Sequence, residues 1–186
     1  VWAIVSNIRK RDVEIPQPSR LLPLVGVVGL AWVFTSINGW TLHPDHGLDR
    51  PAPQMAWHKI ELLYEDVAMQ LKDEYGVTPQ TVVASGDIGA VGYFSRATIL
   101  DTVGLVTPAV SSYYPVSPSI IPEGQNYAIP PQLILDNKPA FLVAMESMVR
   151  LGLEQDATFK ADYELVREIP TDFYGKGMYV YARRGE

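Results

Sequence analysis

The sequence predicts an α/β protein in which one transmembrane helix precedes a small three-layer α/β domain. Three observations lead to this fold class. Residues 21–40 carry no charged side chain, residues 81–101 read as strand, short helix and strand, and two alternating segments near the C-terminus predict an antiparallel hairpin. Of the 186 residues, 47% are hydrophobic, which is enough for a packed core and argues against a disordered chain.

The first predicted element is the uncharged segment, residues 21–40. Its 20 residues, LLPLVGVVGLAWVFTSINGW, would extend about 30 Å as a helix, which matches the hydrocarbon core of a bilayer. Residues 1–8 are apolar and read as the end of a preceding span, so we expect a piece of a longer protein. The alternative for residues 21–40 is a buried core helix of a soluble protein.

The distribution of charge predicts an orientation for this helix. Residues 9–20 carry four basic and two acidic side chains, whereas residues 41–186 carry 11 basic and 19 acidic ones. Short cytoplasmic loops are enriched in Lys and Arg. We therefore expect residues 1–20 to form the end of a span and a cytoplasmic basic loop, residues 21–40 to cross the membrane, and residues 41–186 to form an extracytoplasmic α/β domain.

The first half of this domain reads as an amphipathic helix followed by a βαβ unit. In residues 53–75 the apolar side chains recur every three or four positions, and Gly76 is a suitable helix stop. Residues 81–85 and 97–101 are short, β-branched strands, and residues 88–94 between them read as one or two helical turns. Such a unit has parallel strands joined by a right-handed crossover.

The second half adds a third strand and the hairpin. Residues 131–137 predict a short helix with Pro in its first turn, and residues 140–146 predict a buried strand. Residues 147–153 are expected to be helical or a tight turn. Residues 163–169 and 178–184 alternate between apolar and polar side chains, which predicts an antiparallel hairpin with a longer loop.

A proline-rich stretch interrupts these elements. Residues 106–131 hold six prolines, with Tyr113, Tyr114 and Tyr127 between them. Proline blocks regular helix and central strand alike, and a structureless connection of this length is often functional. One interpretation is a binding loop whose aromatic rings stack on sugar faces. The other is a rigid surface segment packed by its own tyrosines.

Composition removes several functional classes. The net charge of −6 argues against a nucleic-acid surface, which requires clustered Lys and Arg. The chain has no Cys, so it has neither a disulfide framework nor a thiolate metal site. His43, His46, Asp49 and His58 are candidate metal ligands, but a proline separates the two histidines and no helix arranges them. A solvated loop is the favoured interpretation there, and we assign no metal site.

Three glycines follow the first predicted strand. Gly86, Gly89 and Gly92 have the spacing G-x-x-G-x-x-G, which differs from the dinucleotide fingerprint G-x-G-x-x-G. Asp101 lies 15 residues after Gly86, short of the roughly 20 expected for a ribose-binding acid. Nucleotide binding is therefore the minor interpretation. The main one is that these glycines, with Gly104 at a later turn, permit tight turns and close packing.

Two aspartates stand where ligand sites of open α/β sheets occur. Asp87 and Asp101 each follow a predicted strand, at its carboxyl end. They are candidates for a carboxylate pair that binds a sugar hydroxyl or a divalent cation. The alternative, which we favour, is that both cap free backbone N–H groups nearby.

The segment VVASGDIGAVGYFSRATILDTVGLVTP, residues 82–108, resembles the extracytoplasmic tail domains of bacterial GT-C membrane glycosyltransferases. These include the protein mannosyltransferase-like and aminoarabinose-transferase-like families. The shared pattern is a DIGAxGY turn followed by xxxDxxGLxxP. The positions that match it are Asp87, Gly89, Gly92, Tyr93, Asp101, Gly104 and Leu105. Outside this segment the resemblance rests on the order of the elements and on a final YxVYxRR-like strand.

The resemblance implies a function for the whole protein. It implies transfer of a sugar from a polyprenyl-phosphate donor to a lipid, glycan or protein acceptor outside the cytoplasm, by an inverting displacement. The acidic residue that aids this displacement lies in the first external loop of the family, which this sequence does not contain. No catalytic residue can therefore be assigned here. The family gives the tail motif no settled catalytic role, so we treat it first as structural.

The favoured hypothesis is thus the accessory extracytoplasmic domain of such a transferase, in a bacterial cell membrane. Expected partners are the bilayer, the remaining transmembrane helices of the same protein, the lipid-linked donor and a glycan or lipid acceptor. No cofactor is expected in this segment. One alternative is a non-catalytic, membrane-anchored binding module, and a second is a nucleotide-binding α/β domain. The candidate ligand-binding residues are Asp87, Tyr93, Asp101, Tyr113 and Tyr114, and the structural motif is Gly86, Gly89, Gly92 and Gly104.

Overall fold

The computed structural model describes residues 18–41 and 56–185, with side chains placed for residues 22–36 and 58–185. The chain divides into two units, residues 1–55 and 56–186, which are described separately. The predictions made for residues 1–17, and for His43, His46 and Asp49, fall outside the described residues. His58 lies in the first turns of a helix of the second unit, and the described residues contain no group of three or more His, Cys, Asp or Glu suited to a metal ion.

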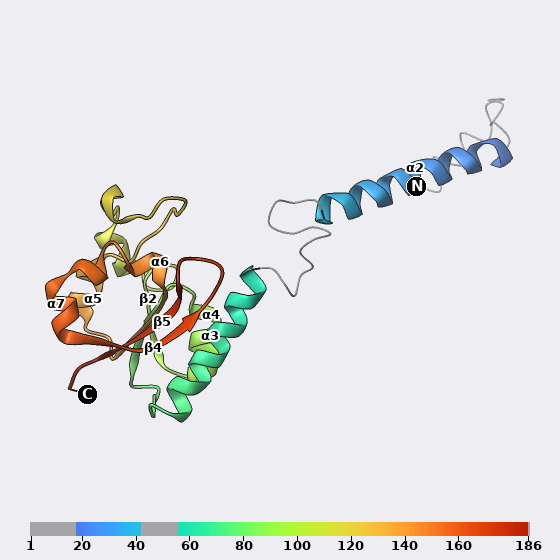
Figure 1. Cartoon of the computed structure of the whole chain (residues 1–186). Helices are drawn as coiled ribbons and strands as arrows, with labels where there is room; N and C mark the ends of the chain where they lie inside the picture. The colour runs from blue at the N-terminus through green and yellow to red at the C-terminus, as the bar shows by residue number, and fades with distance from the viewer. Residues whose placement is uncertain (1–17, 42–55, 186) are drawn as a thin grey trace. The chain divides into compact units, whose positions relative to one another are not determined.

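The first unit contains helix α2, Pro18–Thr41, which includes the segment 21–40 (Figure 1). The helix is confirmed, and it includes Pro23, whose ring removes one backbone hydrogen bond from the helix interior. The expected membrane span is not confirmed, because none of the helices in the described residues has the length and apolar character needed to cross a bilayer.

The second unit is a mixed α/β domain built on a five-stranded sheet, and this confirms the predicted fold class for the domain. The strand order is β2-β1-β3-β5-β4. The strands are β1 Val82–Ser85, β2 Thr98–Asp101, β3 Phe141–Met145, β4 Tyr163–Pro170 and β5 Gly177–Arg183. β2, β1 and β3 are parallel, whereas β5 runs antiparallel to both β3 and β4.

Helices cover both faces of this sheet, because the strand residues alternate between two apolar clusters (Figure 1). Val83 and Val143 pack in the cluster that includes α3, Ala56–Asp73, and α4, Ile88–Ser95. Ala84 and Leu142 face the opposite cluster. That cluster includes buried residues of the short helices α5, Pro131–Asn137, α6, Glu146–Val149, and α7, Ala157–Asp162. The apolar periodicity of 3.6 in α3 and of 2 in the strands therefore builds two cores from one sheet.

Both local supersecondary predictions are confirmed. β1, α4 and β2 form the βαβ unit, with Ser85 beside Asp101 in the register. β4 and β5 form the hairpin, with a register shift between Leu165 and Arg167. The proline-rich stretch contains two short 3₁₀ helices, Pro108–Tyr113 and Pro118–Ile120, in place of regular structure. A third 3₁₀ turn, Leu153–Gln155, follows α6. α7 was not predicted; Asp156 caps its N-terminus, and the Asp156 carboxylate accepts from the N–H groups of Thr158 and Phe159.

Candidate functional site at the carboxyl edge of the parallel strands

The three parallel strands end along one edge of the sheet, which we call the carboxyl edge. β1 ends at Ser85 and β2 at Asp101, and these residues are register partners. The chain passes from β1 to β2 on one side, whereas β3 pairs with the other side of β1. In open α/β sheets this change of side leaves a crevice beyond the strand ends, where ligands bind. The carboxyl edge is therefore the candidate location of a ligand site.

Asp101 does not offer a free carboxylate at this edge. It is fully buried, and its Oδ1 accepts hydrogen bonds from the N–H groups of Val103 at 2.9 Å and Gly104 at 3.0 Å. Its Oδ2 accepts from the N–H of Val106 at 2.6 Å. Gly104 has φ +92°, a conformation that favours glycine. The geometry gives Asp101 and Gly104 the structural role of holding the loop that follows β2.

Asp87 does not cap α4 in the way that the sequence predicts. It occupies the N-cap position of α4, but its side chain makes no capping hydrogen bond. The carboxylate instead interacts with Glu61 of α3, so the sequence-based expectation of a cap at Asp87 is corrected. The competing interaction is with a side chain 26 positions earlier, which no local pattern reveals. Glu61 and Asp87 are named here the carboxyl pair.

The environment of the carboxyl pair favours the protonated forms. Burial raises the pKa of Asp87, and its hydrogen bond with Glu61 partly offsets this. Burial, the charge of Asp87 and the hydrogen bond with Asp87 raise the pKa of Glu61. Beneath them lies Tyr64, which is fully buried; burial and then the Asp87 charge raise its pKa, and the neighbouring Ser85 hydroxyl lowers it slightly. No hydrogen bond of regular geometry satisfies the Tyr64 hydroxyl.

The raised pKa values predict how stability depends on pH. The folded state binds protons more tightly than the unfolded chain, whose carboxyls have pKa values near 3.8 and 4.5. The contribution of the pair is therefore full at low pH and is lost as the pH rises through the raised values. We expect Asp87→Asn to raise the melting temperature at pH 7 and to have little effect at pH 4. Thermal unfolding followed by circular dichroism measures this, with Glu65→Gln on the same helix as control. A loss of stability at pH 7 alone would contradict the prediction.

The glycines of the motif serve packing. A Cβ on Gly86 would lie 3.3 Å from the Thr102 hydroxyl and 3.5 Å from the Tyr127 hydroxyl. A Cβ on Gly92 would lie 3.1 Å from the Ile99 side chain, so this glycine lets α4 approach β2 closely. Gly89 faces open space. A phosphate cradle requires room beside the first glycine, and here Thr102 and Tyr127 occupy that room. The geometry therefore does not favour nucleotide binding.

The tyrosines of the proline-rich stretch fix its backbone. Tyr114 donates to the carbonyl oxygen of Thr102 at 2.7 Å, and the hydroxyls of Tyr127 and Thr102 are 2.6 Å apart. The Tyr114 and Tyr127 rings are stacked, with centroids 6.4 Å apart. Tyr113 donates to Asp136 of α5 at 3.0 Å. These contacts favour the rigid surface segment over the sugar-stacking loop, although part of the Tyr113 and Tyr114 rings stays accessible.

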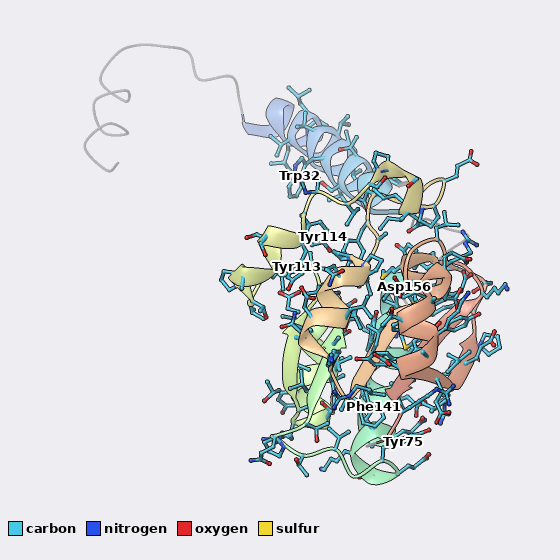
Figure 2. The ribbon with its side chains drawn as sticks, turned by 90° about the vertical axis from the view of Figure 1, so that its left-hand side faces the viewer. Trp32, Tyr75, Tyr113, Tyr114, Phe141 and Asp156 are labelled. Atoms are coloured by element: carbon cyan, nitrogen blue, oxygen red, sulfur yellow. The ribbon has the colours of Figure 1, made fainter. Side chains whose placement is uncertain are left out.

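Figure 2 shows Tyr113 and Tyr114 together at one end of the domain, with Tyr75 and Phe141 at the other. Phe141 begins β3, so the two tyrosines lie toward the carboxyl edge. Tyr93 of α4 is 68% exposed, and it packs edge-to-face on Phe94 with centroids 5.0 Å apart. Among the predicted ligand residues Tyr93 is the most exposed, and the Arg96 guanidinium lies over its ring, 5.8 Å from the centroid.

Sequence reasoning missed Glu146, the residue that follows β3 at the same edge. Its side chain is buried, and Oε2 accepts from the backbone N–H of Lys176 at 3.2 Å and lies 3.6 Å from the Arg150 guanidinium. This carboxylate ties the β4–β5 hairpin loop to the end of β3. The neighbouring Ser147 hydroxyl is buried without a hydrogen-bond partner. The sequence does carry a signal for Glu146, because this charged residue stands at the end of the apolar run AFLVAME.

A shallow cleft lies elsewhere, beside α7 and the β4–β5 pair. Its volume is about 460 Å³, and its lining includes Phe159, Tyr181 and Glu154. The aromatic rings there are almost fully buried, and Tyr181 already donates to Glu154 at 2.8 Å. None of the residues proposed from the sequence lines this cleft, and it offers little aromatic face to a ligand.

The fold and the carboxyl edge define a class of protein. It is a mixed α/β domain in which a carboxyl pair and a rigid loop lie beyond the ends of the parallel strands. The chain belongs to the family described as Domain of unknown function (DUF8728), which matches residues 53–182. This match covers the α/β domain from the start of α3 to β5. We found no match to the chain among curated proteins and none among solved structures.

Proposed function

We propose that residues 56–186 form the accessory domain of a bacterial membrane glycosyltransferase, which moves a sugar from a polyprenyl-phosphate donor to an extracytoplasmic acceptor. One observation supports this above the others. The segment 82–108, which resembles the tail domains of such enzymes, folds as one continuous unit of β1, α4, β2 and the loop held by Asp101. This unit forms most of the carboxyl edge. The residues that carry the resemblance therefore lie together in the folded domain.

The carboxyl pair gives this domain a specific task, the binding of sugar hydroxyls. When Glu61 and Asp87 share one proton, the protonated carboxyl donates a hydrogen bond and the ionised one accepts. Neighbouring hydroxyls of a sugar need such a donor and acceptor side by side. Burial raises the pKa of both carboxyls and the negative charge of Asp87 raises the pKa of Glu61 further, which supports a proton retained by the pair. Catalytic chemistry is assigned to a part of the protein outside this sequence.

The test is a transfer assay on membranes that contain the complete polypeptide to which this chain belongs. The double variant Glu61→Ala, Asp87→Ala has neither the donor nor the acceptor, and we expect it to raise KM for the acceptor substrate about tenfold, the effect of losing about 1.4 kcal/mol of hydrogen bonding. Glu65→Gln, one turn further along α3, is the matched control. Unchanged KM and turnover in the double variant, with the fold intact, would remove the proposed role of the pair.

The same assay separates the proposal from a non-catalytic binding module. A module would bind sugars through the carboxyl pair, and membranes holding the complete polypeptide would show no transfer. The sequence that precedes Val1 is a further discriminator. A series of hydrophobic spans with an acidic first external loop favours the transferase, and a soluble upstream region favours the module.

A further inference from the structure

The loop that begins at the carboxyl edge is free of charge over an unusual length. From Thr102 to Pro122 the chain has 21 consecutive residues without Asp, Glu, Lys or Arg, in a protein with 19% charged residues and a net charge of −6. We call this segment the uncharged loop. A loop without charged side chains can leave water without the cost of desolvating a charge.

The uncharged loop presents large apolar side chains to the outside. Leu105 is 76% exposed, Val106 is 61% exposed and Val103 is 42% exposed. Single exposed apolar residues are normal on a protein surface, but three within four positions form a small apolar tip. We call residues 103–106 the apolar tip.

Hydrogen bonds within the domain hold the backbone of the apolar tip in place. The buried Asp101 carboxylate accepts three backbone N–H groups, from Val103, Gly104 and Val106. Tyr114 anchors the preceding carbonyl of Thr102 at 2.7 Å. The buried carboxylate of Asp101 and the hydroxyl of the half-buried Tyr114 thus hold apolar side chains outward. Preorganisation of this kind lowers the entropic cost of binding.

The apolar tip follows β2 at the carboxyl edge, the edge at which α3 begins. Glu61 in the first turns of α3 interacts with Asp87 beyond the end of β1, so the chain enters the second unit at the carboxyl edge.

We propose that the apolar tip inserts into the interfacial region of a lipid bilayer, with Leu105 and Val106 at the boundary of the acyl chains. Three side chains are too few for a stable protein interface, which buries roughly 800 Å² on each partner. They suit a shallow lipid contact, where buried apolar area alone supplies affinity and no charge has to be removed from water. The contact would hold the carboxyl pair, at the same edge, close to a lipid-linked sugar. It does not depend on sugar transfer, and its test needs no enzymatic readout.

The absence of Cys from the chain permits a clean test with single labels. Leu105→Cys carries an environment-sensitive fluorophore on the apolar tip. Gln80→Cys carries it on an exposed position before β1, at the opposite edge of the sheet, as the matched control. The labelled full chain is bound to vesicles of phosphatidylcholine, and flotation verifies binding. Circular dichroism verifies that both variants keep the fold.

We expect the label at position 105 to shift to shorter wavelength on vesicles and to be quenched by lipids that carry a nitroxide near the headgroup. The label at position 80 should remain unchanged, and both results should be the same at low and high salt, because the loop has no charge. An unshifted label at position 105 on chain that floats with the vesicles would overturn the inference and would favour a protein partner for the apolar tip. Equal shifts at both positions would also overturn it, since they report adsorption without a preferred face.

Discussion

Replacing Asp101 by alanine is expected to lower the free energy of unfolding by about 3 kcal/mol, because three buried charge-assisted hydrogen bonds disappear together. The N–H groups of Val103, Gly104 and Val106 now lie within 3.0 Å of the carboxylate oxygens. Without this acceptor the loop must rearrange to reach water. Urea unfolding of the full chain, followed by circular dichroism at neutral pH, measures the loss.

Two further variants test the cause of this loss. Asp101→Asn keeps one oxygen acceptor, so we expect it to retain part of the stability lost in Asp101→Ala. Asp136→Ala removes an exposed carboxylate that accepts from Tyr113 and Gln132, and its cost should stay below about 1 kcal/mol. An Asp101→Ala variant no less stable than Asp136→Ala would show that the loop does not depend on the buried carboxylate.

Gly175→Ala is expected to destabilise the domain by about 3 kcal/mol or more, the second large effect. Gly175 has φ +92°, and an added Cβ would overlap the Glu146 carboxylate and crowd the backbone N–H of Ser147. That carboxylate is buried and already holds the hairpin loop through Lys176. The clash therefore cannot be relieved by moving an exposed side chain. Thermal and urea unfolding of the variant measure the effect.

Gly124→Ala is the matched control for this variant. Gly124 also has a left-handed backbone, φ +75°, but an added Cβ would meet no atom within 4 Å. It should cost only the conformational penalty of about 1–2 kcal/mol. The difference between the two alanine variants then isolates the contact between the hairpin loop and Glu146. Equal losses at the two positions would mean that Glu146 is free to move and does not fix the loop.

Much of the domain follows from local pattern. The βαβ unit and the C-terminal hairpin are readable because their strands are short, bounded by turn residues and adjacent in sequence. The place of β3 between β1 and β5 is set by non-local pairing, which periodicity does not encode. α7 was missed because six residues give too short a pattern, although Asp156 is a good cap signal. The expected membrane span over residues 21–40 came from hydropathy alone, and the structure supports only its helical part.

The candidate site was less accessible to sequence reasoning. Asp87 and Asp101 look equivalent in sequence, since each ends a predicted strand. They differ in the structure because backbone N–H groups surround Asp101, whereas Asp87 meets the carboxyl of Glu61. Glu61 lies on the helix face that the pattern assigns mostly to solvent, and only the packing of α3 on α4 brings it to Asp87. Electrostatic partners of this kind depend on tertiary distance and cannot be found from spacing.

The direction of the last strand has a practical consequence. Because β5 runs antiparallel to β3 and pairs Ala182 with Phe141, the polypeptide leaves the domain at the end opposite the one it entered. A capture tag or a solid support joined after Glu186 would therefore sit away from Glu61, Asp87 and Leu105. Immobilised in that way, the domain would present these side chains to dissolved glycans or to a supported membrane without obstruction.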